Sequence, residues 1–331
     1  MAGHPLPKGE GLKVSMTRNK EKATKMNKGK SKFRLHEFII EKSMASIAFV
    51  SFAFIILILI FVFREAIPLI IGTATDDFGK VTLKNMLALA WQPVSNSPQY
   101  GLLPLIVGSL KVTFVAMGFA FPVAILAALF TSTFAPKWAK EILKPAIEIL
   151  AGFPSVVIGF FALTVLASFF QHVLGLRYRL NAFTGGIALS LAVIPIVYTV
   201  AEDAINVLPK TMREASYALG ATKWETSLFI LLPAATPGVF AALLLGLGRA
   251  FGETMIVLMA TGNAALLSPH LFEPVRTMSA TIGAEMAEVV FGDAHYNTLF
   301  FIGVCLFMFS FSLNAIAELF IRNKMMKRFS N

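Results

Sequence analysis

The stretch that decides the fold is REASYALGATKWETSLFILLP, residues 213–233. It begins with polar residues, and long apolar runs precede and follow it. The tetrapeptides TMRE at 211–214 and TKWE at 222–225 both match the capping box, in which a threonine hydroxyl accepts from the third helical amide. Gly220 lies between them, where the first helix needs a residue that tolerates a positive φ. The stretch therefore predicts a helix, a hinge and a second helix.

The composition places the chain in a membrane. It has 331 residues, of which 56% are hydrophobic and 15% charged, with 31 phenylalanines, more apolar than a soluble domain of this length. The single cysteine, Cys305, excludes a disulfide within the chain and a thiolate metal site. The histidines lie in unrelated segments, so we predict no metal site; they are His4, His36, His172, His270 and His295.

Six stretches contain the roughly 20 apolar residues that a helix needs to cross the hydrocarbon core. They are residues 43–63, 102–130, 145–170, 182–201, 234–260 and 298–321. The predicted fold class is thus all-α integral membrane, with about six transmembrane helices. The predicted division is a basic, largely disordered tail at 1–42, a six-span domain at 43–325, with a connecting loop at about 202–233, and a short tail at 326–331.

The distribution of basic residues predicts the orientation. Of the 29 Lys and Arg, 21 lie in the tails and in the second and fourth connections, and only six lie in the alternate connections. Cytoplasmic loops carry the excess of positive charge, so both termini are predicted to be cytoplasmic. We interpret the basic N-terminal arm as a partner of anionic membrane lipid rather than of nucleic acid.

The sequence Glu214-Ala215-Ser216, followed by Gly220 and then by ILLP at 230–233, resembles the EAA motif of importer-type ABC permeases. Ser216 is the one departure. The resemblance implies a coupling helix that docks into a cleft on a separate ATP-binding subunit, with Glu214 in polar contact and Gly220 at the bend. The alternative from the pattern alone is an interfacial hairpin on the headgroups. The chain itself is not expected to bind ATP.

Arg249 and Glu253 are four residues apart, on one face of a predicted helix inside the fifth apolar stretch. An unpaired arginine at mid-membrane costs about 2.5–3.5 kcal/mol, so the two are expected to pair. Gly246, Gly248 and Gly252 are expected to allow close helix contact. The pair either lines an anion pathway or only locks helix packing.

The run GLGRAFGET at 246–254, AGFPS at 151–155 and Tyr100-Gly101 resemble permease subunits of phosphate-specific ABC importers, the C-type (PstC-like) more than the A-type. The resemblance covers about residues 40–325 and implies the type I ABC importer permease fold. It also implies a second permease subunit, two ATP-binding subunits and an extracytoplasmic phosphate-binding protein as partners. The substrate pathway would hold Arg249, Glu253 and Lys111.

Three features depart from the family: the basic tail, the external Arg177 and Arg179, and Lys111, which either binds substrate or snorkels to the outer interface. The expected function is phosphate import by alternating access, without a cofactor and without catalysis by this chain. One rival is import of another oxyanion, namely sulfate, molybdate or tungstate. Another is a regulatory or scaffold protein that transports nothing.

Overall fold

A computed structural model describes residues 35–76 and 79–320. The chain divides into two compact units, residues 1–60 and 61–331, and each is described by itself. The described part of the first unit is the N-terminal stretch of helix α2 (Leu35–Ile71), in which nearly every side chain from residue 38 to residue 60 is exposed. The helix thus includes residues 35–42, which were predicted to belong to the tail. The rest of that tail and the C-terminal tail lie outside the described residues.

The second unit is mostly helical. Its elements are β1 (Ala74–Asp76), β2 (Gly79–Val81), the 3-10 turn η1 (Asn85–Leu87), β3 (Trp91–Gln92), β4 (Gln99–Tyr100), α3 (Leu103–Leu129), the π-helical turn η2 (Phe130–Phe134), α4 (Lys137–Ala151), α5 (Ser155–Phe161), the π-helical turn η3 (Ala162–Leu166), α6 (Ala167–Leu174), α7 (Ala182–Asn206), α8 (Lys210–Ala218), α9 (Lys223–Glu225), the π-helical turn η4 (Thr226–Leu231), α10 (Leu232–Ala234), α11 (Thr236–Gly252), α12 (Met255–Ala260), α13 (Met278–Glu285) and α14 (Ala294–Phe320).

Five of the described helical segments are long and apolar enough to cross a membrane, and a bent pair makes up to six. The five are Phe38–Ile71, Leu103–Phe134, Ser155–Leu174, Ala182–Asn206 and Ala294–Ile316. The pair consists of Lys223–Ala234 and Thr236–Gly252, which meet at 73°. The prediction of a helical membrane protein with about six spans is confirmed, although the bounds of the third and fifth spans differ from those predicted.

The third span begins later than predicted. The expected stretch at 145–170 includes the end of α4, but the helix breaks at Gly152 and the next one, α5, starts at Ser155. Pro154 immediately precedes α5, so it marks a helix start rather than a kink within a span. Proline suits that position because its missing amide would be unpaired there anyway. Pro195, in contrast, lies inside α7.

The fifth span ends earlier than predicted. A continuous helix was predicted at 234–260, but α11 ends at Gly252 and Glu253 has an extended backbone, with φ −69° and ψ 133°. A separate helix, α12, starts at Met255. The next connection contains a short helix, α13.

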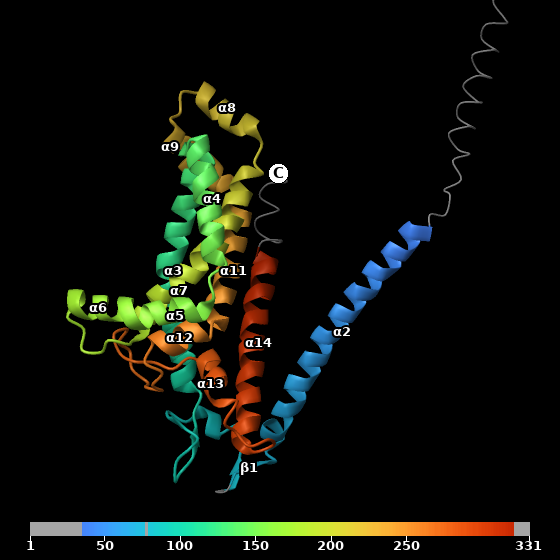
Figure 1. Cartoon of the computed structure of the whole chain (residues 1–331), viewed down its shortest axis with the longest axis vertical. Coiled ribbons are helices and arrows are strands. Elements are labelled where there is room, and N and C mark those ends of the chain that lie inside the picture. The colour runs from blue at the N-terminus through green and yellow to red at the C-terminus, as the bar shows by residue number, and fades with distance from the viewer. Residues whose placement is uncertain (1–34, 77–78, 321–331) are drawn as a thin grey trace, which may run out of the picture. The chain divides into compact units, whose positions relative to one another are not determined.

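Helices α3, α7 and α11 lie side by side and form the centre of the second unit (Figure 1). Small residues allow this approach: a Cβ at Gly186 would lie 2.5 Å from Val115 Cβ, and one at Gly246 would lie 2.6 Å from Val197 Cγ2. Such close contacts are typical of membrane helices, which gain little from the hydrophobic effect in lipid. The centre of this unit is therefore held by close packing of glycine and alanine.

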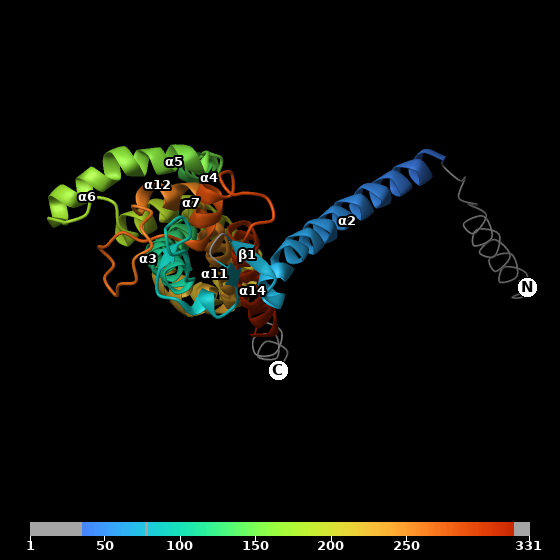
Figure 2. The ribbon, with the colours of Figure 1, turned by 90° about the horizontal axis from the view of Figure 1, so that it is seen from below.

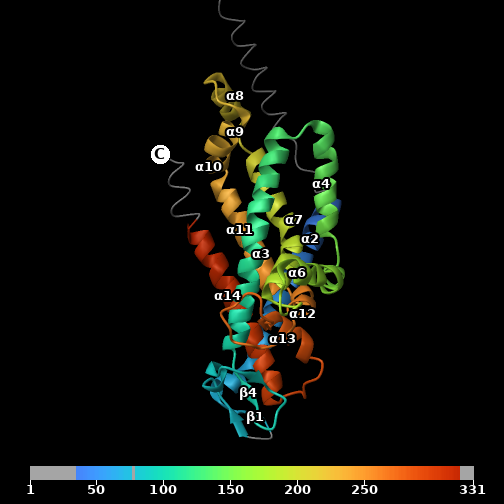
Figure 3. The same ribbon diagram turned by 90° about the vertical axis from the view of Figure 1, so that its left-hand side faces the viewer.

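The second unit has two distinct ends (Figure 3). One end carries α8 and α9, and we call it the coupling end; the other carries the two β-hairpins, and we call it the hairpin end. β1 pairs with β2 in antiparallel register, as does β3 with β4, where Trp91 lies opposite Tyr100. The sequence analysis did not predict these strands, which are only two or three residues long.

In the π-helical turn η3, a basic side chain donates to a backbone carbonyl group. A π-turn interrupts the regular i to i−4 hydrogen bonds of an α-helix and often occurs at functional sites. Arg179 Nη2 donates to the carbonyl of Leu163 in η3 at 2.6 Å. Helix α5, before this turn, contacts α7 and α12, whereas α6, after the turn, extends away from them (Figure 2). Arg179, one of the departures from the family, thus has a structural contact.

Candidate functional site

Arg249 and Glu253 meet at the break between α11 and α12. Arg249 Nη2 lies 3.5 Å from Glu253 Oε2, so the expected ion pair is present. The two residues do not share one continuous helix, because α11 ends between them. The arginine side chain is 48% exposed and that of Glu253 only 6%. The guanidinium thus faces open space, while its counterion is held in the protein.

Other segments hold Glu253 in place. Its Oε1 accepts from the Met255 amide at 3.2 Å, at the start of α12, and its carbonyl accepts from the Ser279 hydroxyl of α13 at 2.6 Å. The Met255 amide thus holds the carboxylate and the Ser279 hydroxyl holds the backbone of Glu253, whereas the longer arginine is free to adjust. The chemistry of the pair suits an anion that approaches Arg249 from the open side.

The three glycines near the pair have different roles. Gly246 packs closely on α7, as predicted. A Cβ at Gly248 or Gly252 would meet nothing within 4 Å in the described part of the chain, so the prediction of close helix contact was wrong for these two. The absence of side chains there leaves space beside Arg249.

Lys111 contacts a loop rather than the Arg249–Glu253 pair. Its Nζ donates to the carbonyl of Ser268 and, at 3.2 Å, to that of His270. Both carbonyls belong to the connection between α12 and α13. No hydrogen bond or ion pair among the described residues joins Lys111 to Arg249. These contacts favour the alternative in which Lys111 reaches toward the membrane boundary and fastens a loop.

The predicted coupling residues lie at the coupling end, on α8 and just after it. Glu214 and Ala215 are exposed, whereas Ser216 is buried and its hydroxyl lies 2.8 Å from that of Thr226. Gly220 has a φ of +87°, so the predicted hinge is confirmed in its geometry. Glu214 and Ala215 thus form an exposed surface on α8.

Of the two predicted capping boxes, only one forms. The Thr222 side chain accepts from the Glu225 amide, and the Glu225 side chain accepts from the Thr222 amide. The prediction of a box at 211–214 was wrong, because the N-cap of α8 is Pro209, two residues before Thr211. Proline at that position sets the entry of the chain and places Thr211 inside the helix.

Sequence reasoning missed a polar cluster at the hairpin end. Glu285 accepts hydrogen bonds from Trp91 Nε1 at 3.1 Å and from Arg276 Nη1, and its Oε2 lies 2.9 Å from His295 Nε2. The four residues come from β3, from the loop before α13, from α13 and from α14. No local spacing reveals such a cluster, because only the tertiary fold brings these residues together.

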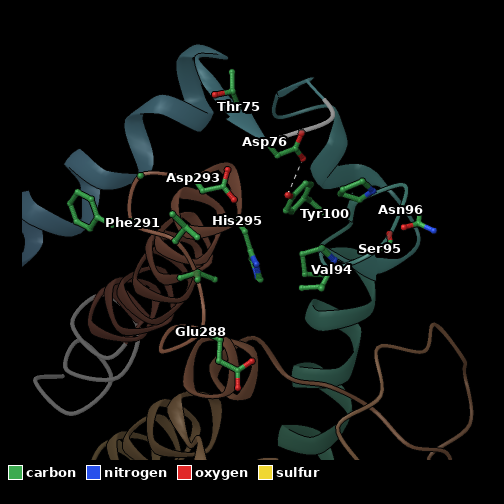
Figure 4. Close-up of a pocket in the computed structure, with 15 residues that line it drawn as sticks. Thr75, Asp76, Val94, Ser95, Asn96, Tyr100, Glu288, Phe291, Asp293 and His295 are labelled. Carbon is green, nitrogen blue, oxygen red and sulfur yellow. Dashed lines mark hydrogen bonds between the residues drawn. The ribbon is translucent and has the colours of Figure 1, made fainter.

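Beside this cluster is an open pocket of about 730 Å³ (Figure 4). Its wall includes Asp76, Glu288, Asp293, Tyr100 and His295. The Tyr100 hydroxyl donates to Asp76 Oδ2 at 3.1 Å. Burial, followed by this hydrogen bond to a carboxylate, raises the pKa of Tyr100 above its ordinary value. The pocket is therefore acidic, which does not suit a phosphate site.

A family model described as the inner membrane component of binding-protein-dependent transport systems matches residues 120–325. The chain belongs to this family. It is accordingly a multi-pass inner membrane protein and a non-catalytic permease subunit of an ABC importer. Permeases of this family work with ATPase subunits and a binding protein.

Curated relatives of this permease include two with informative names. The chain is 39% identical over 233 residues to the probable ABC transporter permease protein YqgH of Bacillus subtilis, covering 70% of this chain and 75% of the relative. It is 31% identical over 284 residues to the phosphate transport system permease protein PstC of Mesorhizobium japonicum, covering 80% and 85%.

Solved structures show the same permease fold. A bacterial alginate ABC transporter, in complex with its pentasaccharide-bound periplasmic protein, matches with a TM-score of 0.57 and 18% identity over 86% of this chain and 96% of that chain. The MetNI methionine ABC transporter, in an inward-facing conformation, matches with a TM-score of 0.53 and 19% identity over 67% and 94%. At this identity the likeness establishes the fold alone.

Proposed function

We propose that this permease moves inorganic phosphate across the cytoplasmic membrane by alternating access. The observation that carries the proposal is the Arg249–Glu253 pair, with an exposed guanidinium and a buried carboxylate at the junction between α11 and α12. An oxyanion has the geometry to take two hydrogen bonds from one guanidinium. The names of relatives such as PstC support phosphate as that anion.

In this proposal Glu253 acts as the resting counterion of Arg249. When the site is empty, the pair is neutral, and the cost of a charged arginine inside the membrane is offset. When phosphate arrives, it competes with the carboxylate for the guanidinium, whose exposed side is free to rotate toward the path. Glu253 stays in place because α12 and α13 hold it.

The coupling end would face the cytoplasm, with both chain termini on that side. There the exposed Glu214 and Ala215 would dock on one ATP-binding subunit (PstB-like), while a second permease (PstA-like) would dock on another. A phosphate-binding protein (PstS-like) would deliver the anion at the hairpin end. ATP binding would close the ATPase subunits, move the coupling helix and turn the central path outward, and hydrolysis would reset it.

Phosphate uptake by cells lacking the gene tests the proposal. The cells are complemented with the wild-type gene, Arg249→Ala or Arg177→Ala, and the membrane level of each variant is measured. Arg177 is a matched control, because its described contact is with the neighbouring Tyr178 ring. We expect wild type and Arg177→Ala to restore uptake and Arg249→Ala to fail at a normal membrane level.

Two results would contradict the proposal. Normal uptake by Arg249→Ala would make the ion pair a packing device. Failure of the wild-type gene to restore phosphate uptake would refute phosphate as the substrate, and uptake of sulfate, molybdate or tungstate would then identify the rival. A gene that restores the uptake of no oxyanion would favour the regulatory or scaffold alternative.

A further inference from the structure

At the coupling end, the residue directly before Glu214 points inward, toward the spans. Arg213 Nη1 donates to the carbonyl of Ser132 and Nη2 donates to the carbonyl of Ile205, both at 3.4 Å. Ser132 lies in the π-turn η2 at the end of α3, and Ile205 lies in the last turn of α7. One guanidinium thus joins α8 to the ends of both central helices.

The two carbonyls are available because of the local backbone. Ser132 lies in a π-turn, which displaces the regular acceptor pattern, and the last carbonyls of any helix lack intrahelical donors. Lys140 Nζ of α4 also donates to the Ser132 carbonyl, at 3.3 Å. Two separate elements, α4 and α8, therefore converge on the end of α3.

The helices that Arg213 joins are themselves fastened together. The Tyr198 hydroxyl of α7 donates to Thr131 Oγ1 of η2 at 3.1 Å, and both side chains are buried. Farther along, Gly186 of α7 packs against Val115 of α3. A displacement applied at the end of α3 and α7 is therefore transmitted along a closely packed pair.

The contacts of the guanidinium are long and incomplete. Its Nε is buried and has no acceptor among the described residues, and the same holds for the hydroxyl of Thr133, which follows Ser132. Buried donors without acceptors are rare and cost free energy. The guanidinium thus has hydrogen-bonding capacity that the described residues do not use.

We infer that Arg213 is a positioning residue that transmits the movement of the coupling helix α8 to the spans α3 and α7. This inference rests on the proposed function, since it takes α8 as the docking element for the ATPase subunit. It assigns different roles to neighbours on one helix: Glu214 and Ala215 face the partner, while Arg213 faces the spans.

The test uses the full complex of both permeases and both ATPase subunits in liposomes. ATP hydrolysis is measured with and without phosphate-loaded binding protein, for wild type, Arg213→Met, Arg213→Lys and Lys210→Met. Lys210 is the matched control, because it is an exposed cation at the start of the same helix. Association of the ATPase subunit is measured for every variant.

We expect Arg213→Met to bind the ATPase subunit and to hydrolyse ATP at the basal rate, but to lose about tenfold in stimulation, as for one charged hydrogen bond. Arg213→Lys should recover part of the stimulation, because an ammonium can still donate to a carbonyl. Lys210→Met should behave as wild type. Wild-type stimulation in Arg213→Met, or loss of the ATPase subunit, would overturn the inference.

A second measurement separates this inference from the choice of substrate. Spin labels are placed at Leu219→Cys, next to α8, and Phe114→Cys, on α3, in a Cys305→Ala background; both positions are exposed. With Arg213 present, the distribution of distances between the two labels should be narrow both with and without ATP. In Arg213→Met this distribution should broaden. An equally narrow distribution in the variant would overturn the inference, whether or not phosphate stimulates the wild type.

Discussion

The hydroxyls of Ser216 and Thr226 lie 2.8 Å apart, across the turn at Gly220. Both side chains are buried, so this contact fastens α8 to the π-turn η4 from the inside. Ser216 is the position at which the chain departs from the EAA pattern. Because it faces inward, the departure does not alter the exposed surface formed by Glu214 and Ala215.

The effect of replacing Ser216 should therefore depend on the size of the new side chain. Ser216→Ala removes one hydrogen bond and leaves the buried Thr226 hydroxyl unpaired, which costs about 1–3 kcal/mol of local stability. The ATPase subunit should still bind, whereas Ser216→Leu should overpack the site and abolish binding. Co-purification of the ATPase subunit and the melting temperature measure both effects. Loss of binding in a stable Ser216→Ala variant would place Ser216 in the partner interface.

Substitutions of Gly220 should follow backbone preference rather than size. A Cβ at this position would meet nothing within 4 Å, so the cost comes from the φ of +87°. Asparagine visits this region more readily than other residues, while a β-branched side chain is a true outlier there. We expect Gly220→Asn to retain most uptake and Gly220→Val to lose it, at a cost of about 1–2 kcal/mol or more. Equal effects of the two would show that side-chain volume decides.

Glu253→Gln tests the role of the counterion. The amide oxygen can still accept from the Met255 amide, but Arg249 loses its negative partner. Phosphate would then bind without competition and leave more slowly. Uptake kinetics should show a KM and a maximal rate that both fall, each by about tenfold for the loss of one charged contact. An unchanged KM would indicate that the pair serves packing alone.

Lys144 supports a prediction on pH. Its Nζ lies 3.0 Å from Glu202 Oε2, and this hydrogen bond raises the pKa of Lys144 above its ordinary value of 10.5. A raised lysine pKa means that the stabilisation is fully present below the ordinary value and is lost as the pH rises through the raised one. The difference in melting temperature between wild type and Lys144→Met should therefore stay constant from about pH 6 to pH 9. A difference that vanishes within this range would contradict the contact.

Features set by neighbouring residues could be predicted from the sequence. The capping box at Thr222 and Glu225 and the left-handed Gly220 follow from local backbone chemistry, and both were found. The box predicted at Thr211 does not form because Pro209, two residues earlier, is the N-cap of α8 instead. The apolar runs likewise predicted the number of spans.

Features set by tertiary contacts could not be predicted. The helix end at Gly252 was not predicted, because the longer apolar runs on both sides of GLGRAFGET were taken as one span. Lys111 could be assigned to the loop carbonyls only after the fold placed residues 268 and 270 beside it. The contacts of Glu285 with Trp91 join positions 194 residues apart.

The cluster around Glu285 has a consequence for local unfolding. Its carboxylate is shared by Trp91, Arg276 and His295, which belong to three separate segments. If one of these segments opens, the Glu285 carboxylate loses one of its hydrogen-bond partners, and the contacts of the remaining segments are weakened. The segments are therefore expected to open together. In hydrogen exchange, the amides of the β3–β4 hairpin and of α13 should share one opening free energy and behave as a single cooperative unit.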